Sequence, residues 1–129
     1  MVQPAIRETA QTDFGSRIKQ FIVQLIHLVS ALPRDQASRV IGDQLLRSGT
    51  SIGANYFEAR AASSRKDYTN YFNHSLKSAN ETMFWLDILL EINSNREAAR
   101  VLHEEVTQLA KIFASSILTL KGKRSRPRA

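Results

Sequence analysis

The chain contains no proline between residues 34 and 126, and its apolar side chains recur at helical spacing through that stretch. Proline is the residue that most strongly interrupts a helix, so its absence permits long continuous helices. Large apolar residues repeat at alternating intervals of four and three, which places them along one face of a helix. No segment alternates apolar and polar residues as a half-buried strand does. The sequence therefore predicts an all-α fold.

Three interruptions divide this pattern into four predicted helices. Pro33 ends the first, which we expect over about residues 14–32 with Thr12 or Asp13 as its N-cap. The second is expected over about residues 36–62. Short links force successive helices to run antiparallel, so we predict an up-down-up-down four-helix bundle.

Pairs of serine and acid indicate where the last two helices begin. Ser64 followed by Asp67, and Ser94 followed by Glu97, have the spacing of capping boxes. In a capping box each side chain bonds the other residue's backbone N–H at the first turn. The fourth helix is expected to end near Leu120.

Most of the net positive charge lies at the C-terminal end. The chain has 18 Lys and Arg against 12 Asp and Glu, a net charge of +6, and five of the basic residues fall within residues 121–129. We predict a disordered basic tail over 122–129, a flexible arm over 1–12 and the bundle over 13–121. Such a tail suits a polyanion through counterion release, and it equally suits a solvated end that aids solubility.

Antiparallel helices bring further basic residues to the same end as the tail. The third helix adds an acid-poor polar face that suits phosphate and sugar contacts, although an ordinary solvated face would look the same. We therefore predict nucleic-acid binding at this end of the bundle. The predicted contact residues are Arg60, Arg65, Lys66, Lys121, Lys123, Arg124, Arg126 and Arg128.

Two predicted helices carry more apolar surface than one bundle face can bury. Eight of the ten residues 83–92 are large and apolar, and leaving such a side chain in water costs roughly 1.5–3 kcal/mol relative to burial. Self-association is the simplest explanation, and an irregular bundle covered by loops or the arm is the alternative. The predicted interface residues are Ile22, Ile26, Val29, Phe84, Trp85 and Ile88.

The second predicted helix combines small and polar residues on its inner faces. Its three glycines are Gly42, Gly49 and Gly53. A glycine inside a helix costs about 1 kcal/mol relative to alanine, so we expect a neighbouring helix to pack closely there, or else a ligand to contact bare backbone. Ser48 and Asn55 fall on the core face, where each needs a polar partner, and Glu81 is a candidate. We interpret such a contact as fixing helix register rather than as catalytic.

The sequence lacks the residue patterns of common catalytic and metal sites. It has no cysteine, and His27, His74 and His103 are not at ligand spacing. There is no phosphate-binding loop and no nucleophile elbow, so we predict a protein that is not an enzyme and has no metal or cofactor. The most apolar window, residues 21–32, is too short to cross a bilayer, and we expect a cytoplasmic protein with no membrane contact.

Two stretches resemble a known family. They are residues 44–56, QLLRSGTSIGANY, and residues 81–86, ETMFWL. Both are similar to the bacterial four helix bundle protein family, also called the ribosomal RNA intervening-sequence protein family. Many members have glycine after the glutamate that corresponds to Glu58, where this chain has alanine. The motif positions, to which we assign a structural role, are Arg47, Ser48, Ser51, Asn55 and Glu81.

The resemblance implies a bundle that assembles as a cyclic homopentamer. One relative, the accessory variability determinant of diversity-generating retroelements, is a basic pentamer that binds nucleic acid and a reverse transcriptase. Other members are encoded within insertions in large-subunit ribosomal RNA genes. The predicted function is a non-enzymatic oligomer that binds nucleic acid, with RNA expected, and by resemblance a reverse transcriptase is a further partner. The alternative is a protein-interaction scaffold that uses the apolar surface of the third helix.

Overall fold

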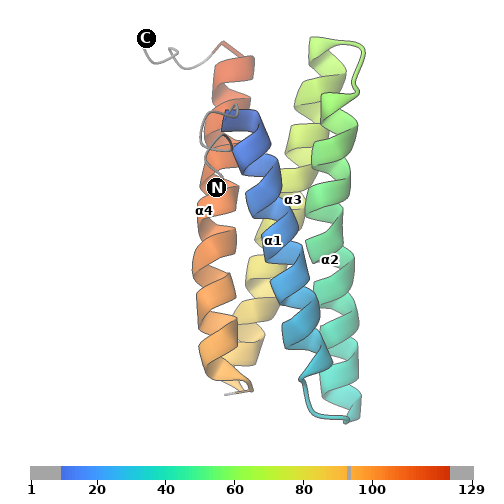
Figure 1. Cartoon of the computed structure of the whole chain (residues 1–129), viewed down its shortest axis with the longest axis vertical. Coiled ribbons are helices and arrows are strands. Elements are labelled where there is room, and N and C mark those ends of the chain that lie inside the picture. The colour runs from blue at the N-terminus through green and yellow to red at the C-terminus, as the bar shows by residue number, and fades with distance from the viewer. Residues whose placement is uncertain (1–9, 93, 123–129) are drawn as a thin grey trace, which may run out of the picture.

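The computed structural model describes the backbone of residues 10–92 and 94–122, and the side chains within these ranges from residue 13 onward. Four helices account for nearly all of it: α1 (Ala10–Ser30), α2 (Gln36–Arg60), α3 (Arg65–Glu91) and α4 (Arg96–Leu120). Successive helices run antiparallel, and each packs on its neighbours in the order α1, α2, α3, α4, with α4 returning to α1 (Figure 1). The prediction of an all-α, up-down-up-down bundle is confirmed.

The ends of α1 differ from the prediction. The helix begins at Ala10, so the expected N-cap at Thr12 or Asp13 is wrong, and the helix includes three residues that we assigned to the arm. Alanine and glutamine at the first two positions favour helix enough to carry it upstream of the threonine. At the other end the helix stops at Ser30 rather than Leu32, because the residue before a proline is disfavoured in helical conformation.

The capping predictions divide between the two later helices. Ser64 caps α3, and its side-chain oxygen accepts a 3.1 Å hydrogen bond from the backbone N–H of Asp67. The capping box predicted at Ser94 is wrong, because the N-cap of α4 is Asn95 in the left-handed conformation, with φ 48° and no side-chain cap bond. Asparagine tolerates that conformation better than most residues, so it takes the sharp turn between α3 and α4.

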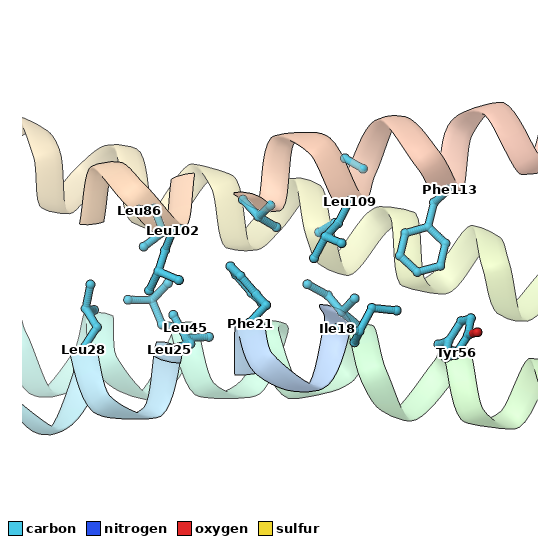
Figure 2. Close-up of a cluster of buried hydrophobic side chains, with 14 of the residues drawn as sticks. Ile18, Phe21, Leu25, Leu28, Leu45, Tyr56, Leu86, Leu102, Leu109 and Phe113 are labelled. Atoms are coloured by element: carbon cyan, nitrogen blue, oxygen red, sulfur yellow. The ribbon is translucent and has the colours of Figure 1, made fainter. Parts of the chain in front are cut away.

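The core differs in composition along the bundle (Figure 2). At the end where α2 and α4 begin, here named the leucine end, buried leucines dominate. They are Leu25, Leu28, Leu45, Leu86, Leu89 and Leu102. At the opposite end aromatic rings fill the centre, among them Tyr56, which is 1% exposed, and Phe113, which is fully buried. The two ends therefore bury different kinds of surface within one continuous core.

The glycines of α2 bring α1 close to it. A Cβ atom at Gly49 would overlap the side chain of Leu25, and one at Gly53 would lie 2.7 Å from Ile22 Cδ1. Since these side chains come from α1, the prediction of close helix packing is confirmed. The alternative, that a ligand contacts bare backbone there, is wrong.

Candidate nucleic-acid interface

Four parts of the chain meet at the end opposite the leucine end: the starts of α1 and α3 and the ends of α2 and α4 (Figure 1). We name it the basic end, after Arg60, Arg65, Lys66 and Lys121. One hydrogen bond joins two of these parts directly, because Arg65 Nε donates to the carbonyl oxygen of Leu120 at 3.0 Å. That carbonyl belongs to the last turn of α4, where no intrahelical partner exists. The predicted meeting of residues 60–66 with the end of α4 is therefore confirmed.

Three of the cations at the basic end are exposed and unpaired. Arg60 ends α2, Lys66 lies in the first turn of α3 and Lys121 is the C-cap of α4. None of the three forms an ion pair with any residue in the described ranges. Glu58 and Asp67 are the nearby exposed acids on the same helices. In the part of the chain that the structure describes, the basic end thus presents cations that no ion pair neutralises.

Arg17, although it lies in the half of α1 that leads to this end, is neutralised. Its guanidinium donates to both carboxylate oxygens of Glu105 on α4, at 2.8 and 3.1 Å. The hydrogen bond to that carboxylate raises the pKa of Arg17 further above its usual value. The pair ties α1 to α4 and leaves little of this charge for a ligand.

Two adjoining hollows indent the surface at the basic end. The larger, which we name the aromatic hollow, has a volume of about 700 Å³ and lies among all four helices. Its lining includes Phe14, Tyr56, Tyr68, Phe72, Lys111 and Thr119. The second, the polar groove, has a volume of about 410 Å³ and runs between α3 and α4. Its lining includes Arg65, Lys66, Thr69, Asn70, Asn73 and Lys121.

The rings of the aromatic hollow form one contacting cluster. Tyr68 stacks on Phe72 with ring centres 4.8 Å apart, and Phe72 meets Phe113 edge to face at 5.2 Å. Phe14 reaches the same cluster from α1, with its ring centre 5.4 Å from that of Tyr56. The sequence interpretation missed this hollow. The signal was the concentration of aromatic residues near the predicted meeting of the four helix ends.

The family motif lies mainly along the contact between α2 and α3, where hydroxyl groups pair across the two helices. Ser48 and Thr82 are buried, and their hydroxyl oxygens are 2.8 Å apart. Ser51 and Ser78 pair at the same distance. Such contacts satisfy buried polar groups and fix the register of two helices.

The partner predicted for Ser48 and Asn55 is wrong. The Asn55 amide donates within its own helix, to the carbonyl and hydroxyl oxygens of Ser51. Glu81 instead pairs with Arg47 and accepts a 3.2 Å hydrogen bond from the indole N–H of Trp85. Glu81 therefore lies on the outer edge of the α2–α3 contact rather than beneath it.

The predicted interface residues fall into two groups. Ile22, Val29, Trp85 and Ile88 are half-buried and pack against the core of the same chain. Ile22 and Val29 lie against the glycines of α2, so the apolar surface attributed to them is covered within one copy. Ile26 and Phe84 remain outside, at 43% and 52% exposed. The assignment of all six residues to an interface between copies stays a prediction.

The remaining predicted contacts lie outside the described residues. These are Lys123, Arg124, Arg126 and Arg128. Within the described ranges, no group of three or more His, Asp or Glu side chains is placed to hold a metal ion. In that same part of the chain, no helix combines the length and hydropathy that a bilayer crossing requires.

Comparison with known proteins gives the family. A model described as 23S rRNA-intervening sequence protein matches residues 12–115. The chain belongs to this family. The crystal structure of a protein of unknown function from the S23 ribosomal protein family of Bacteroides thetaiotaomicron is similar, with a TM-score of 0.75 and 38% sequence identity. That similarity covers 81% of this chain and 97% of the other. A search of curated proteins found no match.

Membership of the 23S rRNA-intervening sequence protein family confirms the resemblance seen in residues 44–56 and 81–86. Both stretches fall within the matched range. Together they supply both sides of the α2–α3 contact, including the Ser48–Thr82 and Arg47–Glu81 pairs. The two stretches that carry the resemblance are therefore the ones that join these two helices.

Proposed function

We propose that this member of the 23S rRNA-intervening sequence protein family is a non-catalytic bundle whose basic end binds nucleic acid, with RNA as the expected ligand. The observation that carries the proposal is the convergence of Arg60, Lys66 and Lys121, exposed and unpaired within the described ranges, where the chain continues into its most basic residues. Unpaired cations bind phosphate groups by releasing the counterions of the polymer. The family description refers to 23S rRNA, which supports RNA as the first ligand to test.

Self-association is the second part of the proposal. Phe84 on α3 is 52% exposed, and Ile92, the C-cap of α3, is 53% exposed. A cyclic homopentamer, as the family resemblance implies, would cover this surface and bring several basic ends together. A weak attraction at each end then becomes a strong one for a long polyanion, because later contacts form at high local concentration.

A pair of charge-matched variants tests the nucleic-acid proposal. Arg60→Gln with Lys66→Gln removes two free cations from the basic end, and Arg34→Gln with Arg39→Gln removes two exposed cations near the leucine end. Both variants have the same net charge, so a difference between them reports position alone. Fluorescence anisotropy with a labelled single-stranded RNA measures affinity across a salt series.

We expect the basic-end variant to bind more weakly at low salt, and its slope of log affinity against log salt to fall by up to about two. The leucine-end variant should bind as the unaltered chain does. Equal binding by both variants would contradict the proposal. Removal of residues 123–129 should flatten the salt dependence further.

The competing function is a protein-interaction scaffold, and the exposed Phe84 favours it if the chain is a monomer. Light scattering on the purified chain measures the oligomeric state and so distinguishes the two functions. A stable monomer would leave the Phe84 surface free for a different protein and would contradict the pentamer. If the chain is an oligomer, Phe84→Asp should dissociate it, whereas Val101→Asp, at an equally exposed position on α4, serves as the control.

A further inference from the structure

The aromatic hollow and the polar groove lie next to each other at the basic end and share the lining residue Leu120. A small recess of about 380 Å³ lies between them and shares Tyr68 and Leu120 with the hollow. The same recess shares Arg65 and Leu120 with the groove. The aromatic hollow therefore lies beside a groove lined by cations and amides.

Tyr68 is the ring at the junction. It is half-buried, and one face stacks on Phe72 at an interplanar angle of 28°. Its neighbours Tyr56 and Phe72 are buried, with exposed fractions of 1% and 4%. Tyr68 is therefore the outermost ring that α3 contributes to the aromatic hollow. A planar ring entering from the groove would meet it first.

Polar groups on α4 also line the aromatic hollow. Lys111 is exposed and forms no ion pair in the described ranges, and the Ser116 hydroxyl forms no hydrogen bond there. The Thr119 hydroxyl donates to the carbonyl of Ser115 at 3.2 Å and keeps its lone pairs for a donor. The aromatic hollow thus combines an apolar ring surface with hydrogen-bond donors and acceptors at its edge, as sites for planar polar molecules do.

We propose that the aromatic hollow binds one unpaired nucleobase of a single strand, with Tyr68 as the stacking surface. The sugar–phosphate backbone on either side lies in the polar groove, against Arg65, Lys66 and Lys121. Charge favours this occupant over an uncharged aromatic compound, because Arg65 lines both the recess and the polar groove. Single-stranded nucleic acids are bound in this way, by aromatic stacking beside a basic track. The inference rests on the proposed function and deepens it.

Two tyrosines of α3 provide a matched test. Tyr68→Ala removes the proposed stacking surface, and Tyr71→Ala removes a half-buried tyrosine of the same helix that does not line the hollow. Tyr68→Phe keeps the ring and should restore binding. Circular dichroism and thermal melting first establish that all three variants are folded.

The probes are an RNA 12-mer carrying one 2-aminopurine, its complementary duplex, and a DNA 12-mer of the same sequence. We expect Tyr68→Ala to weaken single-strand binding by about 5- to 150-fold, the range that loss of one stacked base produces. Tyr71→Ala should leave it unchanged. Quenching of 2-aminopurine should accompany binding of the unaltered chain and disappear in Tyr68→Ala.

Other outcomes would overturn the inference. Equal losses for single strand and duplex would mean that Tyr68 does not select an unpaired base. A loss of affinity for RNA but not for DNA would mean that Tyr68 contacts the ribose rather than the base, because both polymers offer the same stacked base. A change in oligomeric state on Tyr68→Ala, without a change in affinity, would make the hollow a contact between copies. If Tyr68→Ala has no effect while Arg60→Gln with Lys66→Gln weakens binding, the base site fails and the proposed function stands.

Discussion

The two ends of the bundle solve the same packing problem with different residues. The leucine end buries aliphatic side chains, and near it Arg100 pairs with both Glu97 and Glu104, while the His103 imidazole contacts Asp87 at 2.8 Å. The basic end buries rings that leave a hollow, and its exposed cations Arg60 and Lys66 are unpaired within the described ranges.

Both kinds of side chain pack closely, the aliphatic ones by interdigitation and the rings in edge-to-face and stacked pairs. Under the proposed function, the leucine end serves mainly stability and the basic end also provides the surface that binds the ligand.

The largest effect should come from the centre of the ring cluster. Phe113 is fully buried and its ring lies near those of Phe14, Tyr56 and Phe72. We expect Phe113→Ala to lower the free energy of unfolding by about 3–5 kcal/mol, measured by urea denaturation. Leu86→Ala at the leucine end, also fully buried, should lower it by about 2–5 kcal/mol. A clearly smaller loss for Phe113→Ala would mean that the basic end relaxes to fill the space.

Enlarging a glycine of α2 should have the next largest effect, and it reaches both ends because α1 spans the bundle. Gly49→Val places methyl groups where Leu25 already lies, and overpacking of this kind costs about 1–3 kcal/mol. Ala54→Val introduces the same β-branched side chain at an exposed position of the same helix, where no neighbouring helix is in its way. Thermal melting of both variants gives the comparison. Equal melting temperatures would show that α1 is free to shift away.

The buried hydroxyl pair should show coupling rather than two independent losses. Thr82→Val leaves the Ser48 hydroxyl without its cross-helix partner, at a cost of about 1–3 kcal/mol. The double variant Ser48→Ala with Thr82→Val should be less destabilised than the sum of the two single variants. Additive losses would mean that the pair does not join α2 to α3.

The smallest effect is a pH dependence confined to the basic end. Burial raises the pKa of the Tyr56 phenol, and the positive charge of Arg60 opposes the shift. Because the folded chain holds this proton more tightly than the unfolded chain, the resulting stabilisation is present below the ordinary tyrosine pKa of 10.0 and is lost as the pH rises above it. Tyr56→Phe should therefore reduce the alkaline loss of stability, measured by urea denaturation at pH 8 to 11. An unchanged profile in Tyr56→Phe would contradict the assignment.

Local patterns predicted local structure well. Ser64 and Asp67 are three residues apart and form their cap without help from the rest of the chain. The pair Ser94 and Glu97 has the same spacing, yet the short turn between α3 and α4 requires Asn95 in a left-handed conformation. The backbone path of that turn is set by how two helices pack, which a short motif does not encode.

Contacts between helices were predicted less well, because they depend on how each helix is rotated about its axis. The glycines of α2 predicted a close neighbour, and only the structure identifies Leu25 and Ile22 of α1. Glu81 was the candidate partner for Ser48 and Asn55, and it instead pairs with Arg47 at the edge of the α2–α3 contact. The aromatic hollow is lined by residues from all four helices, so no single stretch of sequence could predict it.

A force applied to the chain after Leu120 is transmitted to the turn between α2 and α3, because Arg65 donates a hydrogen bond to the Leu120 carbonyl oxygen. The guanidinium joins two segments that are 55 positions apart in the sequence. Any force that drew Lys121 outward would have to break this tether or drag the first turn of α3 with it. The end of the chain and the corner of the bundle therefore respond to load as one mechanical unit.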